Sequence, residues 1–275
     1  MFTNSELPMC MLHRNEELNN MDFVLFHLYK GNKEYREYYN QLHEKEPTRL
    51  TILDNSAYEF YIKGEELVEE EYIKAIEEYK PSLYICPDVL MDKEKTLELT
   101  IPFLEKYAFK FNRHSLPLCV IQGNTATELM DCLKKYYRCN QTCIAIPFHN
   151  SFFKEYADEH ILNEWRLEFG CLTEDMKYAA GRCSFLNQYK DVLGQAMYIH
   201  LLGSHNPWER FWIEKNLPGL VNSMDTGYPV KVGYAGYEMF QEPGKPEVII
   251  DDFLNEELDV ETQERIARNV LKFKG

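Results

Sequence analysis

Residues 116–137 read LPLCVIQGNTATELMDCLKKYY and contain the unit from which the fold can be predicted. The first six residues are almost all apolar and have the length of a buried strand. A short polar loop follows at 122–124. Residues 125–137 are amphipathic, and Thr125 or Thr127 is placed to cap the start of a helix. The stretch therefore predicts a strand, a polar loop and a helix, in that order.

The same alternation recurs along the chain. Further apolar runs of strand length occur at 22–28, 50–53, 83–86, 142–146, 197–202 and 220–224, with an eighth at 230–234 or 247–250. Helix-like stretches occur at 65–79, 92–107, 207–216 and 261–273. Continuous apolar runs are typical of parallel strands buried on both faces. Strands that alternate with helices predict an α/β fold, and eight such units in 275 residues predict a (β/α)8 TIM-like barrel.

We expect this barrel to be a single domain over residues 1–275. The segment 148–195 is longer than one strand-to-helix connection needs, so we expect a helical insertion there. A doubly wound sheet is the alternative fold. Its phosphate-binding fingerprints, GxGxxG and GxxxxGK[ST], are not present in the sequence.

The composition limits the kinds of partner. Hydrophobic residues make up 45% of the chain, which is enough for a sizeable core. The formal net charge of −15 argues against wholesale wrapping of nucleic acid. Acidic residues concentrate at 65–78 and 251–261, whereas 103–142 carries more Lys and Arg than acids. This distribution predicts a narrow, salt-sensitive contact with a polynucleotide.

No apolar run is long enough to span a membrane, and the first residues lack the features of a signal peptide. We therefore expect a cytoplasmic protein with free thiols and no membrane partner. The nearest metal-like pattern is Cys139, Cys143 and His149, but no CxxC occurs. Because Cys143 lies inside an apolar run, we expect no metal site.

Polar residues follow several of the predicted strands. Asp54, Asp88, Gln122 and Asp225 all come directly after apolar runs. In a (β/α)8 barrel, catalytic groups come from the carboxyl ends of the strands. A single Asp at such a place is often only a helix cap, but three carboxylates and a carboxamide at equivalent positions indicate a site.

This set suits glycosyl transfer. One carboxylate attacks an anomeric carbon, a second moves protons, and the remaining Asp and Gln can bind the edge of a purine. Tyr58 lies in the loop after Asp54, where its ring is placed to stack on a base. We expect His200 to be a satisfied interior histidine, and His205 to be available to a phosphate.

Five motifs, taken in order, resemble those of the tRNA-guanine transglycosylase superfamily, whose members exchange guanine for a 7-deazaguanine within a polynucleotide. The motifs are DNSAYE at 54–59, CPDV at 86–89, VIQG at 120–123, HLLGSHNP at 200–207 and MDTGYP at 224–229. The corresponding family patterns are DSGG(F/Y)Q, an aspartate that binds guanine, VQG, YLMGVGxP and MFDxxxP. The family fold is a (β/α)8 barrel.

The resemblance implies a role for each matching residue. It assigns the nucleophile to Asp225, proton transfer to Asp54, guanine-edge binding to Asp88 and to Gln122 with Gly123, and the two faces of the base to Tyr58 and to Leu202 with Gly203. It implies no cofactor and no metal in the reaction. The target nucleotide would be flipped out of its stack to reach the site.

The chain differs from the family in three places. IAIPFH at 144–149 replaces a glycine-rich GLAVGE, Ser56 and Ala57 replace two glycines, and the CxCxxC…H zinc module is missing. A short, zinc-free chain of this kind resembles the virus-encoded branch that places 7-deazaguanines into DNA. The resemblance thus implies DNA and the free deazaguanine base as partners, in the host cytoplasm if the chain is viral.

Several alternatives stay open. The polymer could be tRNA, or the enzyme could exchange or hydrolyse the base of free nucleosides. A barrel glycosidase is a further alternative, although only Trp165, Trp208 and Trp212 are available for a sugar-binding cleft. The last is a non-catalytic nucleic-acid-binding relative. The oligomeric state and the identity of the deazapurine are not indicated by the sequence.

Overall fold

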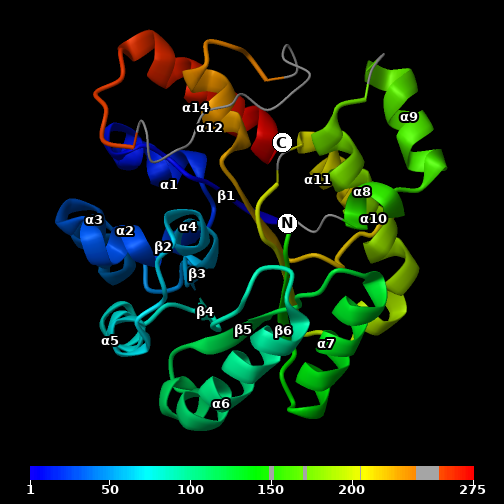
Figure 1. The fold of residues 1–275 in the computed structure, drawn as a ribbon. Helices are drawn as coiled ribbons and strands as arrows, with labels where there is room; N and C mark the ends of the chain where they lie inside the picture. The colour runs from blue at the N-terminus through cyan, green and yellow to red at the C-terminus, as the bar shows by residue number, and fades with distance from the viewer. Residues whose placement is uncertain (149–151, 170–171, 205, 240–253) are drawn as a thin grey trace. The chain divides into compact units, whose positions relative to one another are not determined.

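The computed structural model describes residues 1–148, 152–169, 172–204, 206–239 and 254–275. It contains eight parallel strands with helices between them, which confirms the predicted (β/α)8, TIM-like class of α/β fold (Figure 1). The chain divides into two compact units. We call residues 21–146 the central unit, and residues 1–20 with 147–275 the terminal unit. The single domain over 1–275 stays a prediction.

The central unit contains five parallel strands in the order β2-β3-β4-β5-β6. They are β2 (Asp22–Leu25), β3 (Thr51–Asp54), β4 (Leu83–Ile85), β5 (Leu116–Val120) and β6 (Cys143–Ile146). Its helices are α2 (Phe26–Gly31), α3 (Lys33–Lys45), α4 (Ala57–Lys63), α5 (Glu69–Tyr79), α6 (Lys93–Phe111) and α7 (Ala126–Arg138). All five strands coincide with predicted apolar runs. Because the strands are parallel, their carboxyl ends lie at one edge of the sheet.

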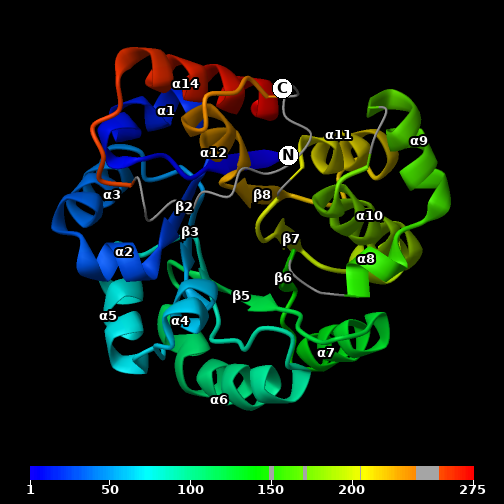
Figure 2. The same cartoon turned by 45° about the horizontal axis from the view of Figure 1, so that its top comes forward.

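The terminal unit contains three parallel strands in the order β1-β8-β7. They are β1 (Phe2–Ser5), β7 (Tyr198–Leu201) and β8 (Ser223–Thr226). Its helices are the 3-10 helix η1 (Met9–Arg14), α1 (Asn15–Leu18), α8 (Phe152–Tyr156), α9 (Glu159–Phe169), α10 (Glu174–Leu193), α11 (Pro207–Asn216), α12 (Tyr228–Tyr234) and α14 (Val260–Lys274). Figure 2 shows α8, α9, α10 and α11 gathered on one side of this unit.

Of the two alternatives predicted for the eighth strand, the one at 230–234 was wrong, and the one at 247–250 stays a prediction. Residues 230–234 belong to helix α12, and 247–250 lie outside the described residues. The eighth strand is β1, whose sequence FTNS contains a single large apolar residue. A search for apolar runs misses such a strand, because Thr3, Asn4 and Ser5 are polar and yet buried in the folded unit.

The observed end of β8 also differs from the predicted one. The apolar run at 220–224 suggested that Asp225 follows the strand, but β8 begins at Ser223 and ends at Thr226. Asp225 therefore lies within a regular parallel strand. This position ties its backbone to β1 and to the loop after β7, since Ser204 N–H donates to Asp225 O at 2.9 Å.

The predicted helical elaboration at 148–195 is present as α8, α9 and α10. Helices α8 and α10 pack so closely that a Cβ at Gly181 would lie 1.7 Å from the carbonyl oxygen of Phe153. Only glycine fits at this crossing. In the part of the chain that the structure describes, no helix is long and apolar enough to cross a membrane.

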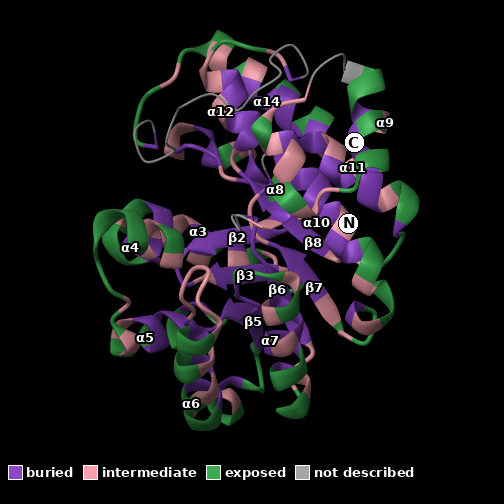
Figure 3. Cartoon of the chain, turned by 45° about the vertical axis from the view of Figure 1, so that its right-hand side comes forward, coloured by how far each residue is buried: buried purple, intermediate pink, exposed green. Residues whose placement is uncertain are grey.

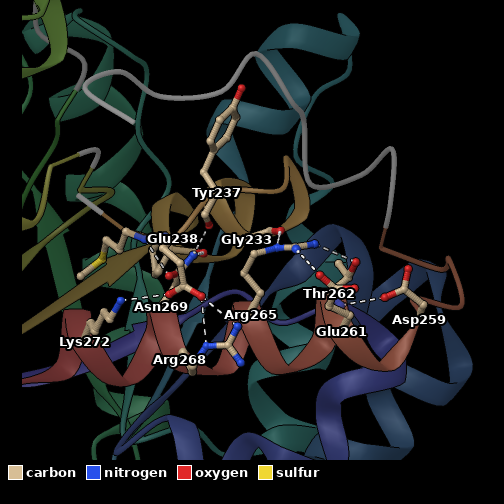
Figure 4. A network of polar contacts seen from close by, with 12 residues as sticks. Gly233, Tyr237, Glu238, Asp259, Glu261, Thr262, Arg265, Arg268, Asn269 and Lys272 are labelled. Atoms are coloured by element: carbon tan, nitrogen blue, oxygen red, sulfur yellow. Dashed lines mark hydrogen bonds and ion pairs between the residues drawn. The ribbon is translucent and has the colours of Figure 1, made fainter. Parts of the chain in front are cut away.

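The strands form the buried centre of each unit, while the outer faces of the helices are exposed (Figure 3). In the terminal unit, α14 holds the segment after β8 in place through a polar network (Figure 4). Buried Asn269 accepts a hydrogen bond from Met239 N–H at 2.7 Å and donates to Tyr237 O at 3.0 Å. Arg265 Nε donates to Gly233 O at 2.9 Å. Helix α12, which directly follows Asp225, is thereby fixed at its far end.

Candidate active site

The predicted site residues fall into two clusters, one in each unit. The central cluster contains Asp54, Asp88 and Gln122, which lie at or just beyond the carboxyl ends of β3, β4 and β5. The terminal cluster surrounds Asp225 on β8. The structure thus brings the predicted residues together within each unit.

Asp88 is the centre of the central cluster. Its Oδ1 accepts a hydrogen bond from Asn55 Nδ2 at 2.7 Å, and its Oδ2 accepts one from Gln122 Nε2 at 2.7 Å. Burial raises the pKa of Asp88, while these two hydrogen bonds act in the opposite direction. The carboxylate is therefore held in one orientation by two amide donors.

Gln122 is almost completely buried and orients Asp88. Its Oε1 accepts a hydrogen bond from Met91 N–H at 3.0 Å, so both ends of its amide are engaged. Direct binding of a base by Gln122 stays a prediction. At Gly123, a Cβ would lie 2.6 Å from Glu128 Cβ, so the glycine lets the loop approach the first turn of α7.

Sequence reasoning missed Asn55. Besides its bond to Asp88, its Nδ2 donates to Cys86 O at 2.8 Å and its Oδ1 accepts from Ala57 N–H at 2.9 Å. Asn55 therefore links the loop after β3 to the loop after β4. Its partners in the loop after β4, Cys86 and Asp88, lie 31 and 33 residues away in the sequence, so no local pattern identifies this link.

The loop after Asp54 adopts an unusual backbone conformation. Ser56 has φ +59°, a left-handed value that costs a residue with a side chain about 1 kcal/mol or more. Its N–H donates to Asp54 Oδ2 at 2.7 Å, and its Oγ accepts from His27 N–H at 3.1 Å. The family motif has glycine in this loop. Here the hydrogen bond to Ser56 Oγ, which glycine could not accept, offsets part of the conformational cost of serine.

Tyr58 lies in the first turn of α4, and 48% of its surface is exposed. Partial burial raises its pKa. The ring is accessible to a base, and stacking on a base stays a prediction.

A cavity of about 500 Å³ adjoins the central cluster and was not predicted. Asn55 and Asp88 form one part of its wall, and apolar side chains such as Phe60, Leu67 and Leu90 form another. A volume of this size accommodates a small organic ligand such as a nucleobase.

In the terminal cluster, Asp225 is only 5% exposed. Its Oδ1 accepts two hydrogen bonds, from Gly203 N–H at 2.9 Å and from His200 Nε2 at 3.0 Å. Gly203 has φ +57°, a backbone conformation that suits glycine. Among the described residues, no hydrogen bond is made to Asp225 Oδ2. One oxygen of the Asp225 carboxylate is therefore oriented by two donors.

His200 is completely buried, as predicted for a satisfied interior histidine. Its Nδ1 lies 2.6 Å from Ser223 Oγ, and that oxygen accepts a hydrogen bond from Tyr198 Oη at 2.5 Å. The prediction did not include its partner at Nε2, which is Asp225. His200 thus belongs to the site.

A buried ion pair holds the loop that contains Leu202 and Gly203. Arg182 and Glu209 are both fully buried and form two hydrogen bonds, of 2.6 Å and 2.8 Å. The remaining Arg182 donors bind Leu202 O and Gly203 O, each at 2.8 Å. The sequence offers no indication of this pair, which positions the donor Gly203 N–H beside Asp225.

Asn4 was missed because β1 was missed. It lies directly opposite Asp225 in the register of β1 and β8, so both side chains are on the same face of the sheet. Asn4 is 1% exposed, and its Oδ1 finds no hydrogen-bond partner among the described residues. A buried amide oxygen without a partner is costly, and it suggests a contact that a ligand would complete.

Most basic residues of the predicted region 103–142 lie on helices α6 and α7. Helix α7 begins near the carboxyl end of β5 and runs back toward the opposite edge of the sheet, so Lys134, Lys135 and Arg138 lie far from Gln122 along the helix. Lys106 and Lys110 pair with Glu69 and Glu77. Contact of this region with a polynucleotide stays a prediction.

No group of three or more His, Cys, Asp or Glu side chains that could hold a metal occurs within the described ranges. His149 and His205, two of the residues considered in the sequence, lie outside those ranges. Comparison with models of known protein families finds no match, and no curated protein sequence is similar enough to count as a relative.

Proposed function

We propose that this chain is a base-exchange glycosyltransferase that replaces guanine by a 7-deazaguanine in a polynucleotide, with DNA favoured over tRNA. The observation that supports this most strongly is the state of Asp225. It is a buried carboxylate with two donors on Oδ1 and no hydrogen bond to Oδ2 from any described residue. This arrangement suits a nucleophile, because one oxygen is oriented and the other can form a covalent bond.

The proposed reaction has two displacements. In the first, Asp225 Oδ2 bonds to C1′, the C1′–N9 bond breaks, and guanine leaves with the electron pair and takes a proton from Asp54. In the second, the incoming base returns a proton from N9 to Asp54 and its nitrogen attacks C1′, which releases the Asp225 carboxylate. Two inversions retain the anomeric configuration.

Recognition of the base is assigned to the central cluster. The ionised Asp88 accepts hydrogen bonds, so it suits the N–H groups on the guanine edge, and Asn55 and Gln122 hold it for that purpose. The resemblance of the motifs supports stacking of the base between Tyr58 and Leu202. Removing the target base from its stack costs a few kcal/mol.

The test is exchange of labelled guanine into duplex DNA and into tRNA, with nuclease digestion and mass spectrometry to identify the incorporated base. Asp225→Asn preserves shape but removes the nucleophile, so we expect exchange to fall by at least about a thousandfold. Undiminished exchange in this variant would exclude Asp225 as the nucleophile. Glu164→Gln, a surface change in the same unit, is the control.

A second candidate is base exchange on free nucleosides. It is favoured by the paired lysines of α6 and by the net charge of −15, which weaken the attraction of a polymer. Parallel assays with deoxyguanosine and with DNA at two salt concentrations separate the candidates. A polymer substrate predicts activity that falls with salt, whereas a nucleoside substrate predicts activity that does not.

A further inference from the structure

The side chains around Asp225 form a chain of hydrogen bonds across two neighbouring strands. Tyr198 and His200 are alternate residues of β7, and Ser223 and Asp225 are alternate residues of β8, with His200 directly opposite Ser223. All four side chains therefore lie on one face of the sheet. The contacts run from Tyr198 Oη to Ser223 Oγ, from Ser223 Oγ to His200 Nδ1, and from His200 Nε2 to Asp225 Oδ1.

The direction of each hydrogen bond follows from the chemistry of its groups. An ionised Asp225 only accepts, so His200 Nε2 carries a proton. Tyr198 donates to Ser223 Oγ, and this leaves the single Ser223 hydroxyl hydrogen for His200 Nδ1. His200 is then neutral.

We infer that His200, Ser223 and Tyr198 are positioning residues for the nucleophile, and this inference rests on the proposed function. Tyr198 and Ser223 fix His200 as the Nε2–H tautomer, and His200 together with Gly203 N–H fixes Asp225 Oδ1. The rotation of the carboxylate is thereby set, and Oδ2 is the oxygen that bonds to C1′. In the covalent intermediate, Oδ1 becomes the ester carbonyl oxygen and keeps both donors.

This role differs from acid–base catalysis. The proton of His200 Nε2 stays on His200 throughout, because Asp225 changes from carboxylate to ester and back without being protonated. His200 therefore acts on the rate of bond formation at C1′ and has little influence on binding of the polymer.

The kinetic test compares His200→Leu, His200→Gln and Ser223→Ala with the wild-type chain. Removing the donor in His200→Leu should lower kcat about a hundredfold with KM nearly unchanged. A glutamine amide reaches a position close to that of Nε2, so His200→Gln should recover kcat to within about tenfold of wild type. The kcat of Ser223→Ala should lie between the kcat values of His200→Leu and His200→Gln. Tyr234→Phe, which removes a hydroxyl group on the exposed side of α12, is the control.

Equal kcat values for His200→Leu and the wild-type chain would overturn the inference, and so would a loss in KM alone. If the wild-type chain exchanges no base, the proposed function fails, and ¹⁵N NMR of the histidine rings then decides the inference. The His200 signals are those that disappear in His200→Gln. If they show a proton on Nε2 and none on Nδ1, they support the inference. Proton on Nδ1 overturns it.

Discussion

The two clusters of candidate site residues, one in each unit, hold their carboxylates in different ways. Asp88 in the central unit is oriented by two side-chain amides, from Asn55 and Gln122, beside a cavity. Asp225 in the terminal unit is oriented by an imidazole and a backbone N–H, and a fully buried ion pair supports the loop that carries that N–H. Side-chain amides can exchange hydrogen-bond partners when a ligand binds, whereas breaking a buried ion pair has a high free-energy cost. The difference suits recognition in the central unit and covalent chemistry in the terminal unit.

The largest expected effect in this comparison comes from breaking the ion pair in the terminal unit. Glu209→Gln removes the carboxylate that pairs with the fully buried Arg182, so we expect a loss of about 3–5 kcal/mol in the free energy of unfolding. Urea denaturation measures it. The control Glu164→Gln breaks an exposed pair with Lys215 and should cost less than about 1 kcal/mol. Equal losses in the two variants would contradict a supporting role for the buried pair.

In the central unit, Gln122→Leu removes the donor to Asp88 and the acceptor of Met91 N–H. We expect a stability loss of about 1–3 kcal/mol, and a tenfold to hundredfold loss in kcat/KM, on the order of one lost hydrogen bond to a charged group. The loss should appear in KM for the free base, because the central unit is assigned to recognition. A loss in kcat with unchanged KM would contradict the assignment of base recognition to the central unit.

A substitution at Asn4, on strand β1 beside β8, tests the terminal unit. Asn4→Leu replaces a buried amide whose oxygen has no partner among the described residues with an apolar side chain of similar size. Stability should stay the same or rise by about 1 kcal/mol, while kcat/KM for exchange should fall about tenfold. Thermal unfolding and the exchange assay measure the two effects. A variant that loses stability and keeps full activity would show that Asn4 has only a structural role.

The smallest expected effect is a shift in pH dependence. Asp88 must be ionised to accept N–H groups of a base, and burial raises its pKa above the ordinary value of 3.8. Base binding should therefore decline, as pH falls, at a higher pH than for an exposed aspartate. Asn55→Ala removes a hydrogen bond that lowers this pKa, so the decline should move to still higher pH.

Titration of base binding measures this shift, and Asn124→Ala is the control, because Asn124 bonds to Met91 O in the same region without contacting Asp88. Identical pH profiles for Asn55→Ala and the wild-type chain would remove Asp88 as the group whose ionisation controls binding.

Much of the fold follows from local patterns. Seven of the eight strands coincide with apolar runs, and helices such as α7 and α11 were predicted to within one residue. β1 was missed because its residues are mostly polar, although three of the four are buried in the folded unit. The helix α12 was taken for a strand because VKVGY is a mostly apolar run of strand length, whereas Pro229 in its first turn and the close packing of Gly233 on α14 favour a helix.

The sequence by itself determined which residue types follow the strands, because the end of a buried strand is a local change from apolar to polar. It could not determine which of them bond to each other. Asn55 with Asp88, His200 with Asp225, and Arg182 with Glu209 are pairs separated by 25 to 33 residues. Their contacts depend on strand register and helix packing, and only the tertiary structure specifies these, since a hydrogen bond requires its two atoms to lie within about 3 Å.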